Sequence, residues 1–101
     1  MSEKARHLVS VRRRVGAASR DAYDYAWGEA ARLAREQGAN AWRFVQTGDE
    51  REFLEFLEFA AGRDPRGAEE LATALRRLSA LGGGEAEEWD ESSIIENHDP
   101  S

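Results

Sequence analysis

The sequence predicts an α+β fold in which an antiparallel sheet carries two helices on one of its faces. Three segments have the alternating, β-branched or aromatic pattern of strands, and two longer segments have apolar residues at helical spacing. They follow one another in the order βαββα, and a further candidate strand closes the chain. The order βαββαβ is that of a ferredoxin-like domain.

Residues 7–15 form the first predicted strand. Val9, Val11 and Val15 put β-branched side chains on alternate positions, which is the period of a strand with one buried face. Gly16 then ends the strand.

Residues 19–37 form the first predicted helix. Ser19 is a suitable cap and Gly38 a suitable stop. Apolar residues recur at helical spacing and predict the buried stripe: Tyr23, Ala26, Trp27, Ala30, Leu33 and Ala34.

Residues 40–46 and 53–59 are predicted to pair as a hairpin around a turn at 47–51. The period of three in the second segment also suits a helix, with Asp49 as cap and Glu52 at the capping-box position. Cross-strand pairing favours the strand. The expected register pairs Gln46 with Glu52, Val45 with Phe53, Phe44 with Leu54, Arg43 with Glu55 and Trp42 with Phe56.

The second predicted helix begins at the Asp64-Pro65 pair, a cap followed by a proline at the first helical position. It ends at the glycine run 82–84. One apolar face is expected along it: Ala68, Leu71, Ala72, Leu75, Leu78 and Leu81.

Residues 85–91 are predicted to form a fourth strand, antiparallel to the first, or else the start of a tail. As a strand, their acidic side chains are expected beside Arg12–Arg14, with Trp89 as the anchor. The expected domain therefore covers residues 1–91. Residues 92–101 are expected to be an acidic, disordered tail.

Composition excludes several classes of function. The 101 residues are 41% hydrophobic and 34% charged, and none of the apolar runs is long enough for a spanning helix. The net charge of −6 comes from the tail, because residues 85–101 hold seven acidic residues and no basic one. The remaining body is nearly neutral, so neither nucleic acid nor a membrane is an expected partner.

The chain has no cysteine, which excludes disulfides, thiolate nucleophiles and cysteine-ligated metals. The first residues lack the apolar core of a signal peptide, so a cytoplasmic location is expected. No metal site and no cofactor are expected.

Four segments together resemble the small dimeric α+β barrel proteins, the superfamily of antibiotic-biosynthesis-monooxygenase-like domains. They are residues 23–27 (YDYAW), 38–44 (GANAWRF), 53–59 (FLEFLEF) and 64–65 (DP), and the resemblance spans about residues 7–91. It implies a homodimer whose sheets face a shared barrel, with a pocket between sheet and helices. Members include cofactor-free monooxygenases, haem-degrading enzymes and isomerases.

The haem-degrading branch has a helical histidine ligand with asparagine and tryptophan helpers. This chain has only His7, on the first predicted strand, and His98, in the tail. Neither matches, so haem is not expected.

Two functions follow as alternatives. The first is binding of, or cofactor-independent monooxygenase-like chemistry on, a small hydrophobic or aromatic molecule; the second is a non-catalytic homodimer whose acidic tail binds another protein. Whether the chain is an enzyme stays open, and no catalytic residue is assigned. The same rings can serve as core instead of pocket walls. The candidate pocket residues are Tyr23, Trp27, Asn40, Trp42, Arg43, Phe44 and His7.

Overall fold

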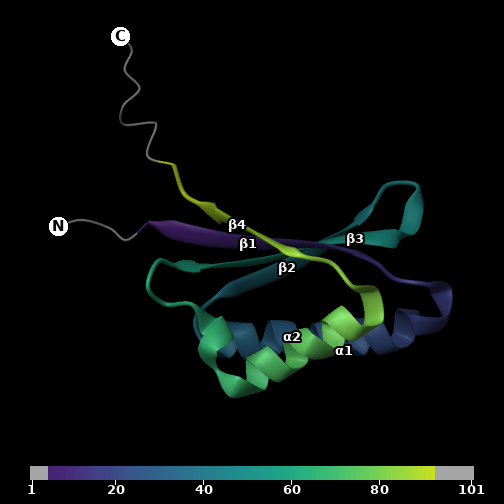
Figure 1. Cartoon of the computed structure of the whole chain (residues 1–101), viewed down its shortest axis with the longest axis horizontal. Coiled ribbons are helices and arrows are strands. Elements are labelled where there is room, and N and C mark those ends of the chain that lie inside the picture. Colours follow the sequence, from purple (N-terminus) through teal and green to yellow (C-terminus); the bar gives the residue numbers. More distant parts are fainter. Residues whose placement is uncertain (1–4, 93–101) are drawn as a thin grey trace, which may run out of the picture.

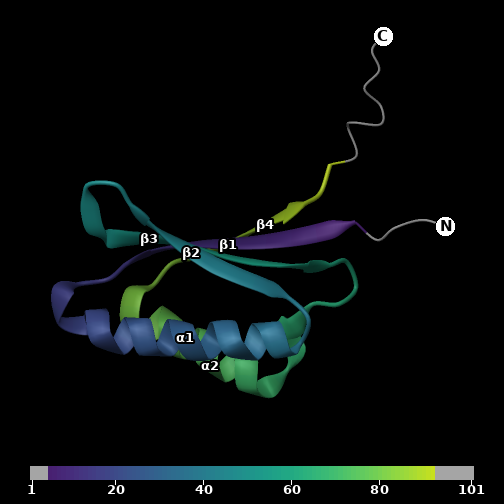
Figure 2. The same ribbon diagram turned by 180° about the vertical axis from the view of Figure 1, so that it is seen from behind.

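The computed structural model describes residues 5–92 and has the predicted βαββαβ order. Its single antiparallel sheet has the strand order β2-β3-β1-β4, and both helices lie side by side beneath one face of it (Figures 1 and 2). The fold is therefore ferredoxin-like. The elements are β1 (Arg6–Arg14), η1 (Ala17–Ser19), α1 (Arg20–Glu36), β2 (Asn40–Gln46), β3 (Asp49–Ala60), η2 (Pro65–Gly67), α2 (Glu69–Gly82) and β4 (Ala86–Asp90).

The hairpin of β2 and β3 confirms the strand interpretation of residues 53–59 and most of the predicted register. Trp42 lies opposite Phe56, and Arg43 lies opposite Glu55. The register shifts after Val45, so Gln46 faces Asp49 instead of Glu52. The turn is consequently shorter than expected, and β3 already begins at Asp49.

The helices begin differently from the prediction. Ser19 makes no capping hydrogen bond through its side chain, because residues 17–19 form a short 3₁₀ helix ahead of α1. Asp64 does cap, accepting a hydrogen bond from the Arg66 amide, but it caps the 3₁₀ helix at 65–67. The α2 helix itself starts only at Glu69.

The fourth strand exists and is antiparallel to β1, as predicted, but its acidic residues do not lie beside Arg12–Arg14. It pairs with residues 7–11 of β1, so that Ala86 faces Val11 and Asp90 faces His7. The glycine run 82–84 lies where the acidic residues were expected. Gly84 passes so close to β1 that a Cβ on it would clash with the Arg12 carbonyl oxygen. The predicted ion pairs between these two segments are therefore wrong.

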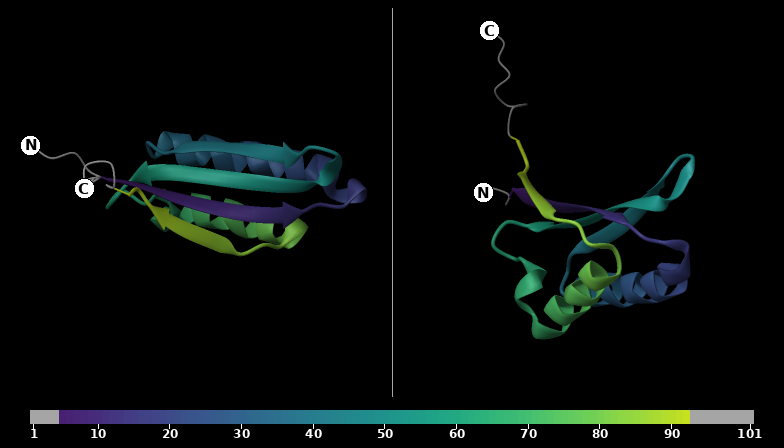
Figure 3. Two further views of the ribbon diagram at one scale, coloured as in Figure 1. Left: turned by 90° about the horizontal axis from the view of Figure 1, so that it is seen from above. Right: turned by 45° about the vertical axis from the view of Figure 1, so that its right-hand side comes forward.

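The core lies between the sheet and the helices. Tyr23, Leu71, Leu78 and Val15 are its largest fully buried side chains. Alternation along β3 puts one set of residues into this core: Phe53, Glu55, Leu57 and Phe59. The intervening residues of β3 point to the opposite side of the sheet, which neither α1 nor α2 covers (Figure 3).

All of the predicted tail except its first residue, Ser92, lies outside the described part of the chain, because residues 93–101 are not described. Within residues 5–92, neither helix has the length and apolar content needed to cross a bilayer.

Candidate functional site

The uncovered face of the sheet, here called the open face, carries an unusual share of aromatic residues. Phe44 is 57% exposed and Trp89 is 52% exposed, although both lie in regular strands. Strand alternation places six large apolar side chains on this face: Leu8, Trp42, Phe44, Leu54, Phe56 and Trp89. A surface of this kind on a small protein marks a site of interaction.

The rings of the open face are ordered by contacts across strands. Trp42 stacks on Phe56, with centroids 5.3 Å apart and planes 21° apart. Phe44 meets the same Phe56 ring edge-on at 5.7 Å. On the edge strand β4, the Trp89 indole donates a hydrogen bond of 3.0 Å to the Ser10 hydroxyl. These contacts restrict the orientations of the rings.

A hollow of about 330 Å³, here called the trough, lies at the end of the open face where β1 begins and β4 ends. Its polar floor is the ion pair between Arg6 and Glu58, 3.3 Å apart. The Asn40 amide donates a further hydrogen bond of 3.0 Å to Glu58 and, together with Arg6, lowers the pKa of that carboxyl. The trough is lined by Arg6, Leu8, Trp42, Glu58, Trp89, Asp90 and Glu91.

The opposite face of the sheet holds a buried polar network. The Tyr23 hydroxyl donates a hydrogen bond of 2.7 Å to Glu55, whose other oxygen lies 2.8 Å from Nε of Arg13. Arg13 also donates to the Gly83 carbonyl. Tyr23 is completely buried, and burial, together with its bond to Glu55, raises the pKa of the phenol. The network is a closed structural element that leaves no exposed acid or base.

Arg43 forms a second group at the edge of the same layer. It donates a hydrogen bond of 2.8 Å to Asp24, and its guanidinium lies over the rings of Tyr23 at 5.0 Å and Trp27 at 5.9 Å. Burial acts against ionisation of Asp24, but the hydrogen bonds from Arg43 and Arg20 lower its pKa. The Arg43 guanidinium thus covers the rings of Tyr23 and Trp27, which were expected to be walls of a ligand pocket.

His7 lies at a third location, where β1 meets β4. Its two ring nitrogens contact Asp90 at 2.6 Å and Glu88 at 2.8 Å. These partners could not be predicted from a local pattern, because they lie more than 80 positions away along the chain. The hydrogen bonds to Glu88 and then Asp90 raise the pKa of His7.

The structure therefore divides the seven candidate pocket residues among three locations. Tyr23, Trp27 and Arg43 lie on the helix side of the sheet, and His7 lies near the β4 edge. The others, Asn40, Trp42 and Phe44, belong to the open face.

Six of the seven residues that line the trough are not among the candidate pocket residues. A register for β4 would have shown them, because Trp89 faces Leu8 and Leu8 faces Glu58. The six are Arg6, Leu8, Glu58, Trp89, Asp90 and Glu91.

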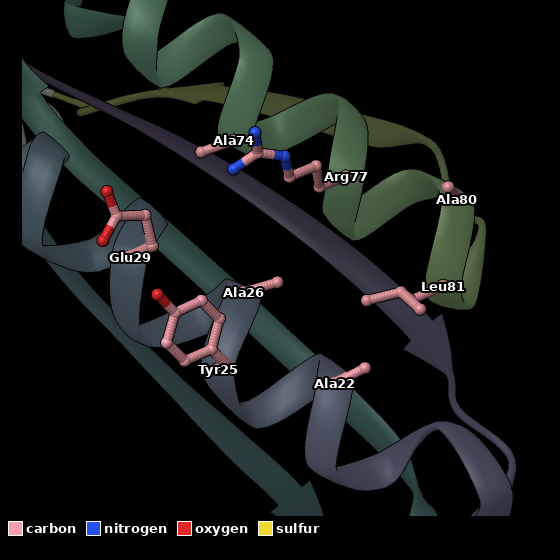
Figure 4. Close-up of a pocket in the computed structure, with 8 residues that line it drawn as sticks. All are labelled: Ala22, Tyr25, Ala26, Glu29, Ala74, Arg77, Ala80 and Leu81. Carbon is pink, nitrogen blue, oxygen red and sulfur yellow. The ribbon is translucent and has the colours of Figure 1, made fainter.

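A second hollow, of about 470 Å³, lies between α1 and α2 (Figure 4). Small side chains keep it open, among them Ala22 and Ala80, and Tyr25 stands beside it with 78% of its surface exposed. Within residues 5–92, no group of three or more His, Cys, Asp or Glu side chains is arranged to hold a metal ion.

Comparison with known proteins bears on the fold. No family profile matches the sequence, and no curated protein is recognisably similar to it. Solved structures do match. A conserved protein of unknown function from Bacteroides thetaiotaomicron, described as a possible oxidoreductase, superposes with a TM-score of 0.76 at 14% identity, covering 87% of this chain and 99% of the other.

Two further structures share the same architecture. A protein described as an antibiotic biosynthesis monooxygenase, from Nitrosomonas europaea, has a TM-score of 0.71 at 8% identity, with 93% and 95% of the two chains covered. SnoaB, a cofactor-independent oxygenase from Streptomyces nogalater, has a TM-score of 0.71 at 12% identity, with 86% and 92% covered. The chain thus has the ferredoxin-like α+β fold of the antibiotic-biosynthesis-monooxygenase-like proteins.

Proposed function

We propose that this chain is one subunit of a homodimeric α+β barrel, in which the open faces of two sheets meet, and that the barrel binds a small hydrophobic or aromatic molecule. The observation that carries the proposal is the ordered set of rings on a face that neither α1 nor α2 covers. Removing these rings from water supplies the driving force for association.

A second copy of the same chain suits this face because its exposed charges are of both signs. Arg12 and Glu87 both lie on the open face, and within residues 5–92 neither makes an ion pair. A twofold interface brings a surface against the same surface of the partner, so a face with unpaired charges of both signs is self-complementary. The resemblance to the dimeric α+β barrel proteins, which implies a homodimer, points to the same arrangement.

Sedimentation equilibrium at micromolar concentration tests the dimer. We expect a species of twice the 11.3 kDa chain mass. A chain that sediments as a monomer across that range, with its fold intact by circular dichroism, would refute the proposal.

The enzymatic form of the proposal is a cofactor-independent oxygenation. In such a reaction the substrate itself supplies all four electrons that reduce O₂: a ring carbon loses its hydrogen and becomes a carbonyl with one oxygen atom, the substrate hydroxyl loses its proton and becomes the second carbonyl, and the other oxygen atom leaves as water with both hydrogens. Similarity to SnoaB supports this form through fold alone. Oxygen uptake with naphthol as substrate, measured with an oxygen electrode, tests the reaction. Oxygen uptake that is proportional to protein concentration and is lost in Trp42→Ala supports it. Oxygen uptake equal to the protein-free rate excludes the reaction for this substrate class.

A second function, a non-catalytic dimer that binds another protein through its acidic tail, is favoured by one observation. The space between sheet and helices is filled by Tyr23 and its network, so the described residues show no cavity behind the sheet at Tyr23. A stable dimer that binds no aromatic probe on either side of its sheet would support this second function.

A further inference from the structure

The trough has the dimensions of a site for a flat molecule. Its two indole walls, Trp42 and Trp89, stand on β2 and β4, the two edge strands of the sheet. Three strand spacings separate those edges, a distance of about 14 Å. Leu8 and the pair Arg6–Glu58 fill the floor between them. The volume between them, about 330 Å³, is large enough for a compound of two fused rings.

Both walls are held in place before any ligand arrives. The Trp89 indole is held by its bond to Ser10, and Trp42 is held by stacking on Phe56. Rings that are already oriented lose little conformational entropy when a flat ligand contacts them. The trough therefore differs from the hollow between the helices, where Tyr25 is largely exposed to solvent.

The charges around the trough determine whether it favours a positively or a negatively charged ligand. Its lining contains three acidic residues, Glu58, Asp90 and Glu91, against the single base Arg6, and even with His7 in contact with Asp90 just outside the lining the acidic groups are in excess. That base is already engaged by Glu58, whose pKa is lowered, so the carboxyl is ionised near neutral pH. The site therefore repels anions and attracts cations.

We propose that the trough binds a planar aromatic molecule that carries a positive charge. This inference rests on the proposed barrel, since the second subunit is expected to roof the open face and to exclude water from the ligand. It differs from a pocket behind the sheet, because the space at Tyr23 and Trp27 is taken by the protein's own side chains.

The three tryptophans of the chain offer a direct test. Each indole N–H gives its own signal in nitrogen–proton correlation NMR, and two of them belong to the trough while Trp27 lies across the sheet. The probes are naphthylmethylammonium and naphthylacetate, which share a ring system and differ in charge. We expect the cation to shift the signals of Trp42 and Trp89 and to leave that of Trp27 in place.

The affinities provide the second readout. We expect the cation to bind at least about tenfold more tightly than the anion, and Glu58→Gln to reduce that preference at least about threefold. The matched control is Glu29→Gln, which removes a carboxylate beside the hollow between the helices and should leave the preference unchanged. Shifts confined to Trp27, equal affinity for both probes, or no shift at about 2 mM probe would overturn the inference.

Failure of this inference is distinguishable from failure of the dimer. If the protein sediments as a dimer and does not bind the cationic probe, the proposed barrel stands and the proposed ligand site is wrong. If the protein sediments as a monomer, the proposed barrel is wrong, and the indole signals then test ligand binding to the trough of a single subunit.

Discussion

The two faces of the sheet differ in how their polar and aromatic groups are partnered. On the helix side, Glu55 is only 4% exposed, and both of its oxygens have partners in Tyr23 and Arg13. On the open face, Phe44 and Trp89 remain about half exposed. A sheet that is covered on one side only needs a single apolar face. The second apolar face therefore indicates a cover that residues 5–92 of one chain do not provide.

The largest expected effect comes from breaking the buried network on the helix side. Arg13→Ala leaves the Glu55 carboxylate buried without its cation and should lower the free energy of unfolding by about 3–5 kcal/mol. Tyr23→Phe removes one hydrogen bond from the same carboxylate and should lower it by about 1–3 kcal/mol. Urea denaturation measures both. Equal, small losses would show that this side is not a closed network.

The glycine run provides the next test, since it determines where β4 joins the sheet. Gly84→Ala puts a Cβ onto the Arg12 carbonyl at a positive φ of 100°, and clash and strain together should lower the free energy of unfolding by at least about 3 kcal/mol. Gly83→Ala is the control: its φ is also positive, but its Cβ meets no atom within 4 Å, so only about 1–3 kcal/mol of strain is expected. If the control variant is destabilised as much as Gly84→Ala, the close approach of residue 84 to β1 is wrong.

A matched pair of exposed rings tests the open face itself. Phe44→Asp should raise the dimer dissociation constant at least about 100-fold, because it places a charge in the interface of both subunits. Tyr25→Asp, a change at an exposed ring on the helix side, should leave it within about threefold. Sedimentation velocity over a concentration series gives both constants. If Tyr25→Asp weakens the dimer and Phe44→Asp does not, the interface lies on the helices and not on the open face.

The smallest expected effect concerns the attachment of β4 through His7. Since contacts with Glu88 and Asp90 raise its pKa above 6.5, the stabilisation from the charged ring is fully present below pH 6.5 and is lost as the pH rises through the folded pKa. The charged groups near the ring come from β4, from η2 and from the cap of η2: Glu88, Asp90, Arg66 and Asp64.

NMR titration of the His7 ring protons measures that pKa, and His7→Gln identifies the signals. Glu88→Gln should bring the midpoint back toward 6.5. A midpoint at or below 6.5 in the unmodified chain would mean that the ring does not hold the strand through charge.

The sequence was sufficient to predict the order of elements and the pairing of β2 with β3, because local period and cross-strand pairs determine both. The register of β4 could not be predicted in the same way. It depends on how closely the glycine run passes Arg12, which is a contact between residues 72 positions apart. For the same reason, the partners of His7 became visible only once β4 was placed beside β1.

The candidate site was predicted in part. Alternation correctly placed Trp42 and Arg43 on opposite faces of the sheet. It did not say which face the helices cover, so residues from both faces were combined into one pocket. Trp89 and Glu58 join the trough only through the strand order β3-β1-β4, which a local pattern does not contain.

The most direct test of the central claim is to observe which side chains touch between subunits. A mixture of isotope-labelled and unlabelled chains allows NMR to select nuclear Overhauser effects that cross the interface. We expect these contacts to come from Trp42, Phe44 and Phe56 on the open face, with none from Tyr25 in the groove between the helices. Contacts from Tyr25 in place of the open-face rings would contradict the account.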